Sequence, residues 1–285
     1  MPRSVQRGDP LMKSQTLVRL FLVALVFSQA ERADADVTLK ERLLQKRQVG
    51  AHRGGNLSGR GNTMLQFKRA LADGADIIET DLQLSKDGVV MVFHDKTLSD
   101  LTNCRGKVSE HILAELRLCR FKTNAELIPT FEELLKWSVG RVVVNAELKK
   151  DEATRPAIDL MNKFNGREWV YFQTQGDRKL YQLARACDAK ANLLFAPTNW
   201  SDAEWAITLP DPRLIIIEFY KTLHDARWIA AAKRSGRLTS ANSFQISQDK
   251  EKSGAASCDR LIALDFDILI TDQTADCVRQ RNQLH

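Results

Sequence analysis

Short runs of apolar and β-branched residues recur along this chain from residue 47 onward, and amphipathic stretches separate most of them. This alternation is typical of repeated strand–helix units that build a parallel sheet. We expect strands over residues 48–53, 76–84, 141–148, 169–174, 191–196, 213–219, 237–242 and 267–271. Helices are expected over residues 63–73, with Asn62 as N-cap, and over 129–138, 154–164, 177–187, 201–207 and 224–235.

Eight strands with crossover helices in about 250 residues favour a closed (β/α)8 barrel, the TIM-barrel fold. A doubly wound open sheet gives the same local pattern and is the structural alternative. The G-x-G-x-x-G fingerprint that such a sheet often carries is absent after the first strand. Because 44% of the chain is apolar, a sizeable core is available, and we expect one barrel domain over residues 36–285.

One unit departs from the strand–helix order. After the second strand the chain turns at Ser85–Gly88 and continues in the β-rich run Val89–His94, and Asp-Gly between two such runs indicates a hairpin. A four-residue loop would place His94 opposite Glu79, whereas a two-residue loop would place it opposite Asp81. The irregular stretch that follows, to about residue 128, predicts a small insertion after the second strand.

The first 35 residues have the order of a secretory signal peptide. Lys13 and Arg19 precede the apolar run Leu20–Phe27, and cleavage is expected after Ala35. Translation could begin at Met12, and a short anchor or buried helix is the alternative. Eight apolar residues are too few to span a bilayer. We therefore expect an exported protein, periplasmic or secreted, without stable membrane insertion.

Export would allow disulfides among the five cysteines. The number is odd, so at least one cysteine stays unpaired, and none has the C-x-x-C spacing of a thiolate zinc site. Cys104 and Cys119 lie in one short loop-rich segment and form the first expected pair. The net charge of +6 is scattered rather than clustered, so nucleic acid is not an expected partner.

Carboxylates alternate at the ends of two buried strands. Glu79 and Asp81 share one strand face, and Asn145, Glu147 and Lys149 share another. Active sites of (β/α)8 barrels lie at the carboxyl ends of the strands. Glu79, Asp81 and Glu147 would there form a hard-oxygen site for Mg²⁺ or Ca²⁺; alternatively, Lys149 and Arg53 would neutralise them without a metal.

Two histidines end strands at the same rim. His52 is followed by Arg53 and Gly54-Gly55, which would let a phosphate approach the backbone, and His94 ends the returning hairpin strand. A lone histidine is more often a hydrogen-bonded structural residue. Two of them beside a carboxylate cluster favour an acid and base pair for phosphoryl displacement.

These residues, with Asn62-Thr63, Asp87-Gly88, Asp95 and Thr271-Asp272, resemble the motifs of the glycerophosphodiester phosphodiesterase family. The resemblance spans roughly residues 48–275 and implies a TIM barrel with a small insertion after the second strand. It also implies divalent-cation-dependent hydrolysis of glycerophosphodiesters to an alcohol and glycerol 3-phosphate. By the same resemblance, His52 and His94 form the acid–base pair, without either role being assigned to one of them. Glu79, Asp81 and Glu147 bind the metal, and Arg53 and Lys149 bind the phosphate.

The sequence departs from the family pattern in two places. Gly61 stands where members usually have Glu before Asn-Thr, which removes an acidic group beside the site. Thr239-Ser-Ala-Asn242 replaces Trp-Thr-x-Asn, which would remove an aromatic wall for the alcohol moiety.

Two other functions remain open. A phospholipase D-like lyase of the same superfamily would form a cyclic phosphate and would need an apolar rim, but the loop at residues 56–60 is polar. A non-catalytic protein that captures phosphodiesters is the alternative outside the enzymes.

Overall fold

The computed structural model describes residues 37–55, 61–245 and 255–283, so the predicted signal peptide lies outside the described residues. Eight parallel strands form a closed barrel, since β1 pairs with both β2 and β9. They are β1 Gln48–Ala51, β2 Ile77–Leu84, β4 Val143–Leu148, β5 Val170–Gln173, β6 Asn192–Phe195, β7 Leu214–Glu218, β8 Leu238–Asn242 and β9 Ile268–Thr271. The predicted TIM barrel is confirmed, and the open-sheet alternative is wrong.

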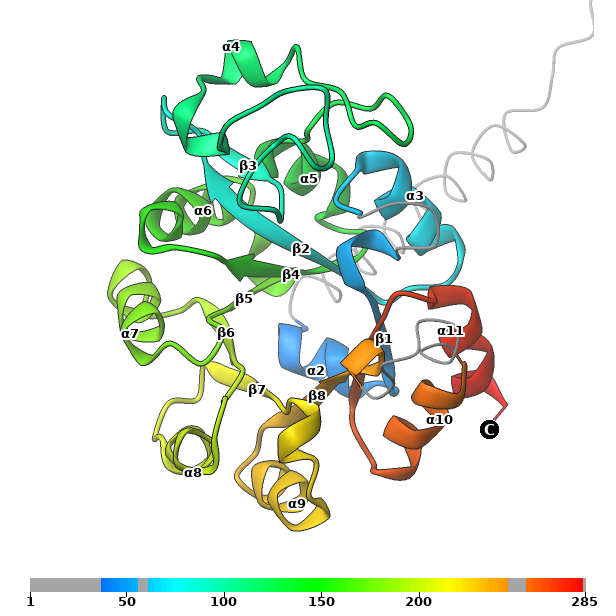
Figure 1. The fold of residues 1–285 in the computed structure, drawn as a ribbon. Coiled ribbons are helices and arrows are strands. Elements are labelled where there is room, and N and C mark those ends of the chain that lie inside the picture. Colours follow the sequence, from blue (N-terminus) through cyan, green and yellow to red (C-terminus); the bar gives the residue numbers. More distant parts are fainter. Residues whose placement is uncertain (1–36, 56–60, 246–254, 284–285) are drawn as a thin grey trace, which may run out of the picture.

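Helices surround the strand ring (Figure 1). They are α3 Met64–Ala72, α5 Phe131–Ser138, α6 Asp151–Lys163, α7 Arg178–Cys187, α8 Trp200–Thr208, α9 Ala226–Arg234, α10 Ala255–Ala263 and α11 Thr274–Asn282. The first six match the predicted helices, although α6 begins three residues early because Asp151 and Glu152 fill its first turn. We did not predict α10 and α11; the sequence of α11 is polar on most faces.

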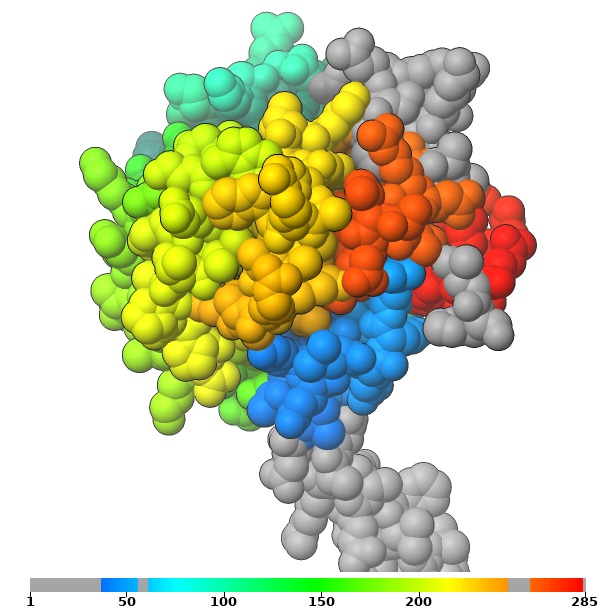
Figure 2. Space-filling view, turned by 90° about the horizontal axis from the view of Figure 1, so that it is seen from below, coloured from blue at the N-terminus to red at the C-terminus, as the bar shows by residue number. Residues whose placement is uncertain are grey.

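A short helix, α2 (Leu39–Leu44), closes the amino-terminal end of the barrel. Its buried Leu39 and Leu43 join the apolar residues that fill the barrel interior, such as Ile77, Val143 and Tyr171. In Figure 2 this blue segment lies at one end of the molecule, and the teal insertion lies at the opposite end. Because α2 covers the amino-terminal end, the carboxyl-terminal rim is the open end of the barrel. There polar side chains replace the apolar ones of the interior.

The hairpin register differs from both predicted ones. β3 (Val90–Val92) pairs antiparallel with β2 through Leu84 and Val90, so five residues separate the strands. This register sets Asp81 opposite Phe93, whose amide donates to the Asp81 carbonyl at 2.9 Å. His94 therefore lies beyond the paired strand, and its place near the carboxylates does not come from cross-strand pairing. The turn is one residue longer than expected, and the Ser85 amide donates to the Val89 carbonyl across it at 2.9 Å.

The insertion has a core of its own, which includes Phe93, Leu98, Val108 and Phe121. It contains η2 (Val108–Glu110) and α4 (Leu113–Leu116). Cys104 and Cys119 form the predicted disulfide inside it. A second disulfide, Cys258–Cys277, joins α10 to α11, and Cys187 is the free cysteine. No helix among the described residues is long and apolar enough to cross a membrane.

Candidate active site

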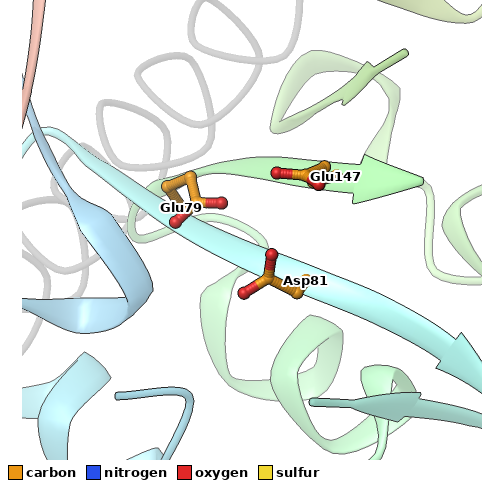
Figure 3. Close-up of side chains that lie close together, drawn as sticks. All are labelled: Glu79, Asp81 and Glu147. Carbon is orange, nitrogen blue, oxygen red and sulfur yellow. The ribbon is translucent and has the colours of Figure 1, made fainter. Parts of the chain in front are cut away.

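Three buried carboxylates meet at the open end of the barrel. Glu79 and Asp81 project from β2, and Glu147 projects from the neighbouring β4 (Figure 3). The strand register places Asp81 directly beside Glu147, and one carboxylate oxygen of each residue lies within 4.8 Å of the others. Carboxylate oxygens at this spacing form a donor set that suits a hard divalent cation. The sequence-predicted cluster is therefore brought together.

The electrostatics of the cluster also fit a cation. Burial, followed by the charges of Asp81 and Glu147, raises the pKa of Glu79 well above its ordinary value. Burial and Asp81 likewise raise the pKa of Glu147. Burial opposes ionisation of Asp81 too, but Lys149 and Arg53 outweigh it and lower that pKa. The protein's own cations therefore favour one ionised carboxylate, and a bound metal ion would favour all three.

Lys149 and Arg53, the predicted phosphate contacts, flank the carboxylates. Lys149 Nζ lies 2.8 Å from Asp81 Oδ1 and also contacts Glu147. Arg53 Nε lies 3.4 Å from Asp81 Oδ2, and its backbone amide donates to Glu79 Oε2 at 2.8 Å. Burial opposes the charge of Lys149, but Asp81 and Glu147 outweigh it and raise its pKa to about 12. Two cationic side chains, Lys149 and Arg53, therefore lie beside the carboxylate cluster, where a phosphate would bind.

Arg53 adopts a left-handed backbone conformation, with φ 51° and ψ 29°. Non-glycine residues in this region carry strain that often accompanies functional sites. Here the conformation lets the amide and the side chain of one residue reach Glu79 and Asp81, respectively. The carbonyl of the same residue accepts from the Asn62 amide at 2.8 Å, which ties the next segment to it.

Asn62 bonds to the carboxylate cluster rather than capping the helix. Its Nδ2 donates to Asp81 Oδ2 at 2.7 Å, and its Oδ1 accepts from the Thr80 hydroxyl at 2.9 Å. The predicted N-cap is thus wrong by one residue, because Thr63 caps α3. Sequence reasoning placed Asn62 at a helix start and missed this buried contact.

The backbone at Gly61, where the family resemblance predicts an acid, leaves no room for a side chain. Its φ is +74°, and a Cβ built there would lie 2.6 Å from the Arg53 carbonyl oxygen. Any side chain at this position would collide with the backbone that positions Arg53. The backbone conformation of the loop therefore favours glycine at position 61.

Each predicted histidine is paired with an aspartate. His52 Nδ1 lies 2.7 Å from Asp272 Oδ1, and His94 Nδ1 lies 2.7 Å from Asp95 Oδ1. Such pairing fixes the ring orientation and leaves Nε2 for the reaction. His52 Nε2 lies 3.9 Å from Glu79 Oε2, which places it beside the carboxylate cluster. Asp272 belongs to a sequence motif that we had identified, but its role was not predicted.

These groups open into one cavity of about 320 Å³. Its lining includes both histidines, both phosphate-contact cations, Glu79 and Glu147. A second wall, which the sequence did not predict, carries Gln175, Glu218, Tyr220, Asn242 and Phe244.

Glu218 is a buried carboxylate in this second wall. Its Oε1 accepts from Asn242 Nδ2 at 3.0 Å, and its Oε2 accepts from the Ser240 hydroxyl at 3.3 Å. Burial raises the pKa of Glu218 to about 7 despite these bonds. The signal was present in the sequence, because Glu218 ends a run of buried apolar residues just as Glu79 follows one.

The predicted loss of an aromatic wall is wrong. Thr239 faces away from the barrel interior, and its hydroxyl donates to Asp267 at 2.9 Å. An aromatic residue at that position would therefore not reach the cavity. Phe244, in η5 (Ser243–Gln245), supplies the aromatic surface instead, and its ring stacks on His52 with centroids 4.3 Å apart.

The geometry agrees with comparisons to known proteins. The model of the glycerophosphoryl diester phosphodiesterase family matches residues 52–193, which hold the carboxylates, both histidines and both cations. A glycerophosphodiester phosphodiesterase from Bacillus altitudinis is 38% identical over 119 residues, covering 39% of this chain and 49% of that protein. The chain spans about half the length of the curated relatives it matches.

Solved structures share the fold. A glycerophosphoryl diester phosphodiesterase from Parabacteroides distasonis superposes with a TM-score of 0.71 at 21% identity, covering 87% of this chain and 93% of that one. An Oleispira antarctica phosphodiesterase, solved with the product sn-glycerol-3-phosphate, has a TM-score of 0.67 at 20% identity, covering 83% and 96%. The family match, the sequence relatives and the common barrel agree, so the chain belongs to the glycerophosphoryl diester phosphodiesterase family.

Proposed function

We propose that the protein hydrolyses glycerophosphodiesters, or a closely related small phosphodiester, to an alcohol and glycerol 3-phosphate with the help of a divalent cation. One observation carries the proposal: one cavity is lined by two histidines, two cationic side chains and two carboxylates of a three-carboxylate cluster, and each histidine is paired with an aspartate. Their combination suits a phosphodiester, which needs charge compensation at phosphorus and two proton transfers.

Glu79, Asp81 and Glu147 would hold the cation, which when bound supplies Lewis-acid stabilisation of the phosphoryl oxygens. Arg53 and Lys149 would bind the remaining phosphate oxygens through charge-assisted hydrogen bonds. Asn62 would keep Asp81 oriented. Gln175, Tyr220 and Asn242, on the opposite wall, offer hydrogen bonds to the hydroxyl groups of a glycerol moiety.

The histidines would move the protons. We assign His52 as the base that takes the proton of the attacking water, and His94 as the acid that protonates the departing alkoxide. The assignment of His94 is supported by its place at the entrance of a second cavity, into which an alcohol can depart. Each aspartate would stabilise the charged form of its histidine during the reaction.

We also propose that the barrel domain over residues 36–285 works in an exported form, periplasmic or secreted. Two disulfides among the described residues support this, because structural disulfides persist in oxidising compartments.

The test uses the full chain, stripped of metal and reconstituted with Mg²⁺ or Ca²⁺. Glycerophosphocholine should release glycerol 3-phosphate only with a cation, and His52→Ala and His94→Ala should each abolish release. His111→Ala removes a histidine of the insertion outside the cavity and should stay active. A cyclic phosphate detected by phosphorus NMR would instead establish a lyase. Binding without turnover under both metals would establish a non-catalytic binding protein.

A further inference from the structure

A second cavity of about 590 Å³ adjoins the catalytic one. The two cavities share His94 and Lys149 in their linings. The second one lies between the insertion, which contributes Lys96 and Lys107, and the start of α6, where Lys150 is the N-cap residue. A group attached to phosphorus on the His94 side would therefore extend into this cavity.

The wall of the cavity beside His94 is held in place. Gln83 Nε2 donates to the carbonyl oxygens of Phe93 and Asp95, at 2.9 Å each, which fixes the backbone on both sides of His94. Farther along the insertion, the Leu98 amide donates to the Gly106 carbonyl at 2.8 Å. These hydrogen bonds tie the backbone of this wall to β2 and to the rest of the insertion.

The charges around this cavity are predominantly positive. Four lysines line it, against the two aspartates Asp95 and Asp100. Lys149 is engaged by the metal-site carboxylates, and Lys107 lies 3.5 Å from Glu110. Within the described part of the chain, Lys96 and Lys150 are exposed and have no carboxylate within ion-pair distance. The lining also holds Asp95, whose Oδ1 lies 2.7 Å from His94 Nδ1, and the exposed Asp100, so four lysines face two carboxylates and the formal charge of the lining is positive.

We propose that this cavity binds the alcohol arm of the substrate and selects alcohols that carry a second anionic group, such as a phosphate. The inference rests on the proposed phosphodiesterase function and names its substrate class. The cavity is larger than the catalytic one, and Lys96 and Lys150 line it together with His94, beside which the alcohol would leave. Lysine binds phosphate as a point charge, so the preference depends on ionic strength.

The test compares two glycerophosphodiesters. Bis(glycerophospho)glycerol has an alcohol arm that carries a second, negatively charged phosphodiester. The alcohol arm of glycerophosphoglycerol is uncharged glycerol. Wild type should show a kcat/KM about tenfold higher for the first, beyond the statistical factor of two for its two equivalent ends. This advantage should shrink between about 20 and about 300 mM salt, because the Debye length then becomes shorter than the phosphate spacing.

The double variant Lys96→Gln/Lys150→Gln should lose this advantage while its kcat/KM for glycerophosphoglycerol stays unchanged. Lys68→Gln/Lys190→Gln removes the same net charge elsewhere on the surface and should keep the advantage. Equal kcat/KM for both substrates in wild type would overturn the proposed selection and leave the phosphodiesterase function intact. An equal decrease in kcat/KM for both substrates in Lys96→Gln/Lys150→Gln would also overturn the proposed selection. Inactivity of the metal-loaded wild type toward both substrates would overturn the proposed function itself.

Discussion

His52 and Asp272 are separated by 220 positions in the sequence, yet His52 Nδ1 lies 2.7 Å from Asp272 Oδ1. The contact exists because β1 pairs with β9, with Ala51 beside Thr271. The next residue of each strand end then projects into the same rim. The His52–Asp272 pair therefore depends on the same β1–β9 pairing that closes the barrel.

Asp272→Asn should lower kcat by about 100-fold or more with little change in KM, because an amide no longer stabilises a charged His52 or fixes its tautomer. Steady-state kinetics over a range of pH would measure both parameters. Asp276→Asn, on the first turn of α11, is the matched control and should keep wild-type kinetics. A fall in kcat smaller than threefold would show that Asp272 does not position His52.

Replacing one proposed metal ligand should weaken metal binding while raising the stability of the metal-free protein. A cation at 100 times its Kd should stabilise wild type by about 2.7 kcal/mol and raise Tm by about 5–10 °C. Glu79→Gln should abolish this shift, yet raise the Tm of the metal-free protein, because it removes a carboxylate whose pKa is raised by burial. Differential scanning calorimetry with and without EDTA measures both effects. Glu204→Gln, an exposed position on α8, should behave as wild type; a metal shift retained in Glu79→Gln would exclude this site.

Two glycines allow a controlled test of the loop at Arg53. Gly61 and Gly88 have φ of +74° and +82°, but a Cβ at Gly88 would meet nothing within 4 Å. Gly88→Ala should therefore cost only about 1 kcal/mol of unfolding free energy and keep activity. Gly61→Ala should cost more and lower activity, because the Arg53 backbone must move. Equal effects of the two substitutions in urea unfolding and kinetics would contradict this account.

Glu218 should make stability depend on pH. Its pKa in the folded protein is about 7, raised from 4.5 by burial, so its favourable contribution is complete below pH 4.5 and is lost as pH rises through 7. The ionised form costs about 3 kcal/mol. Glu218→Gln should therefore gain about 2–3 kcal/mol relative to wild type between pH 5 and pH 8, measured by urea unfolding. A constant difference between the two proteins across this range would show that Glu218 is not buried as described.

The sequence predicted the barrel because strand and helix periods are local properties. Apolar runs such as Leu214–Ile217 mark strands regardless of where they pair. The hairpin register was not predictable in the same way, since it depends on one additional residue in the turn between Leu84 and Val90. The hydrogen bond between Ser85 and Val89, which crosses that turn, leaves no pattern in the sequence.

For the site, prediction succeeded where several reactive residues lie close together in sequence. Glu79 and Asp81 share a strand, so their common face follows from a period of two. Glu218 and Phe244 were missed because each stands alone in its segment, and only the closed barrel brings them to the cavity. At position 239 the sequence reasoning assigned a cavity role to a residue that does not reach the cavity. Its side chain points outward, although the neighbouring Ser240 bonds to Glu218.

The disulfide Cys258–Cys277 encloses β9 and Asp272 in one covalent loop. While the polypeptide is being synthesised, residues 258–277 leave the ribosome only after strands β1 to β8 have done so. Until they do, β1 lacks its second neighbour and His52 lacks its aspartate. A nascent chain that stops short of Asp272 would therefore hold every proposed metal ligand and phosphate contact and still lack the carboxylate that bonds to His52.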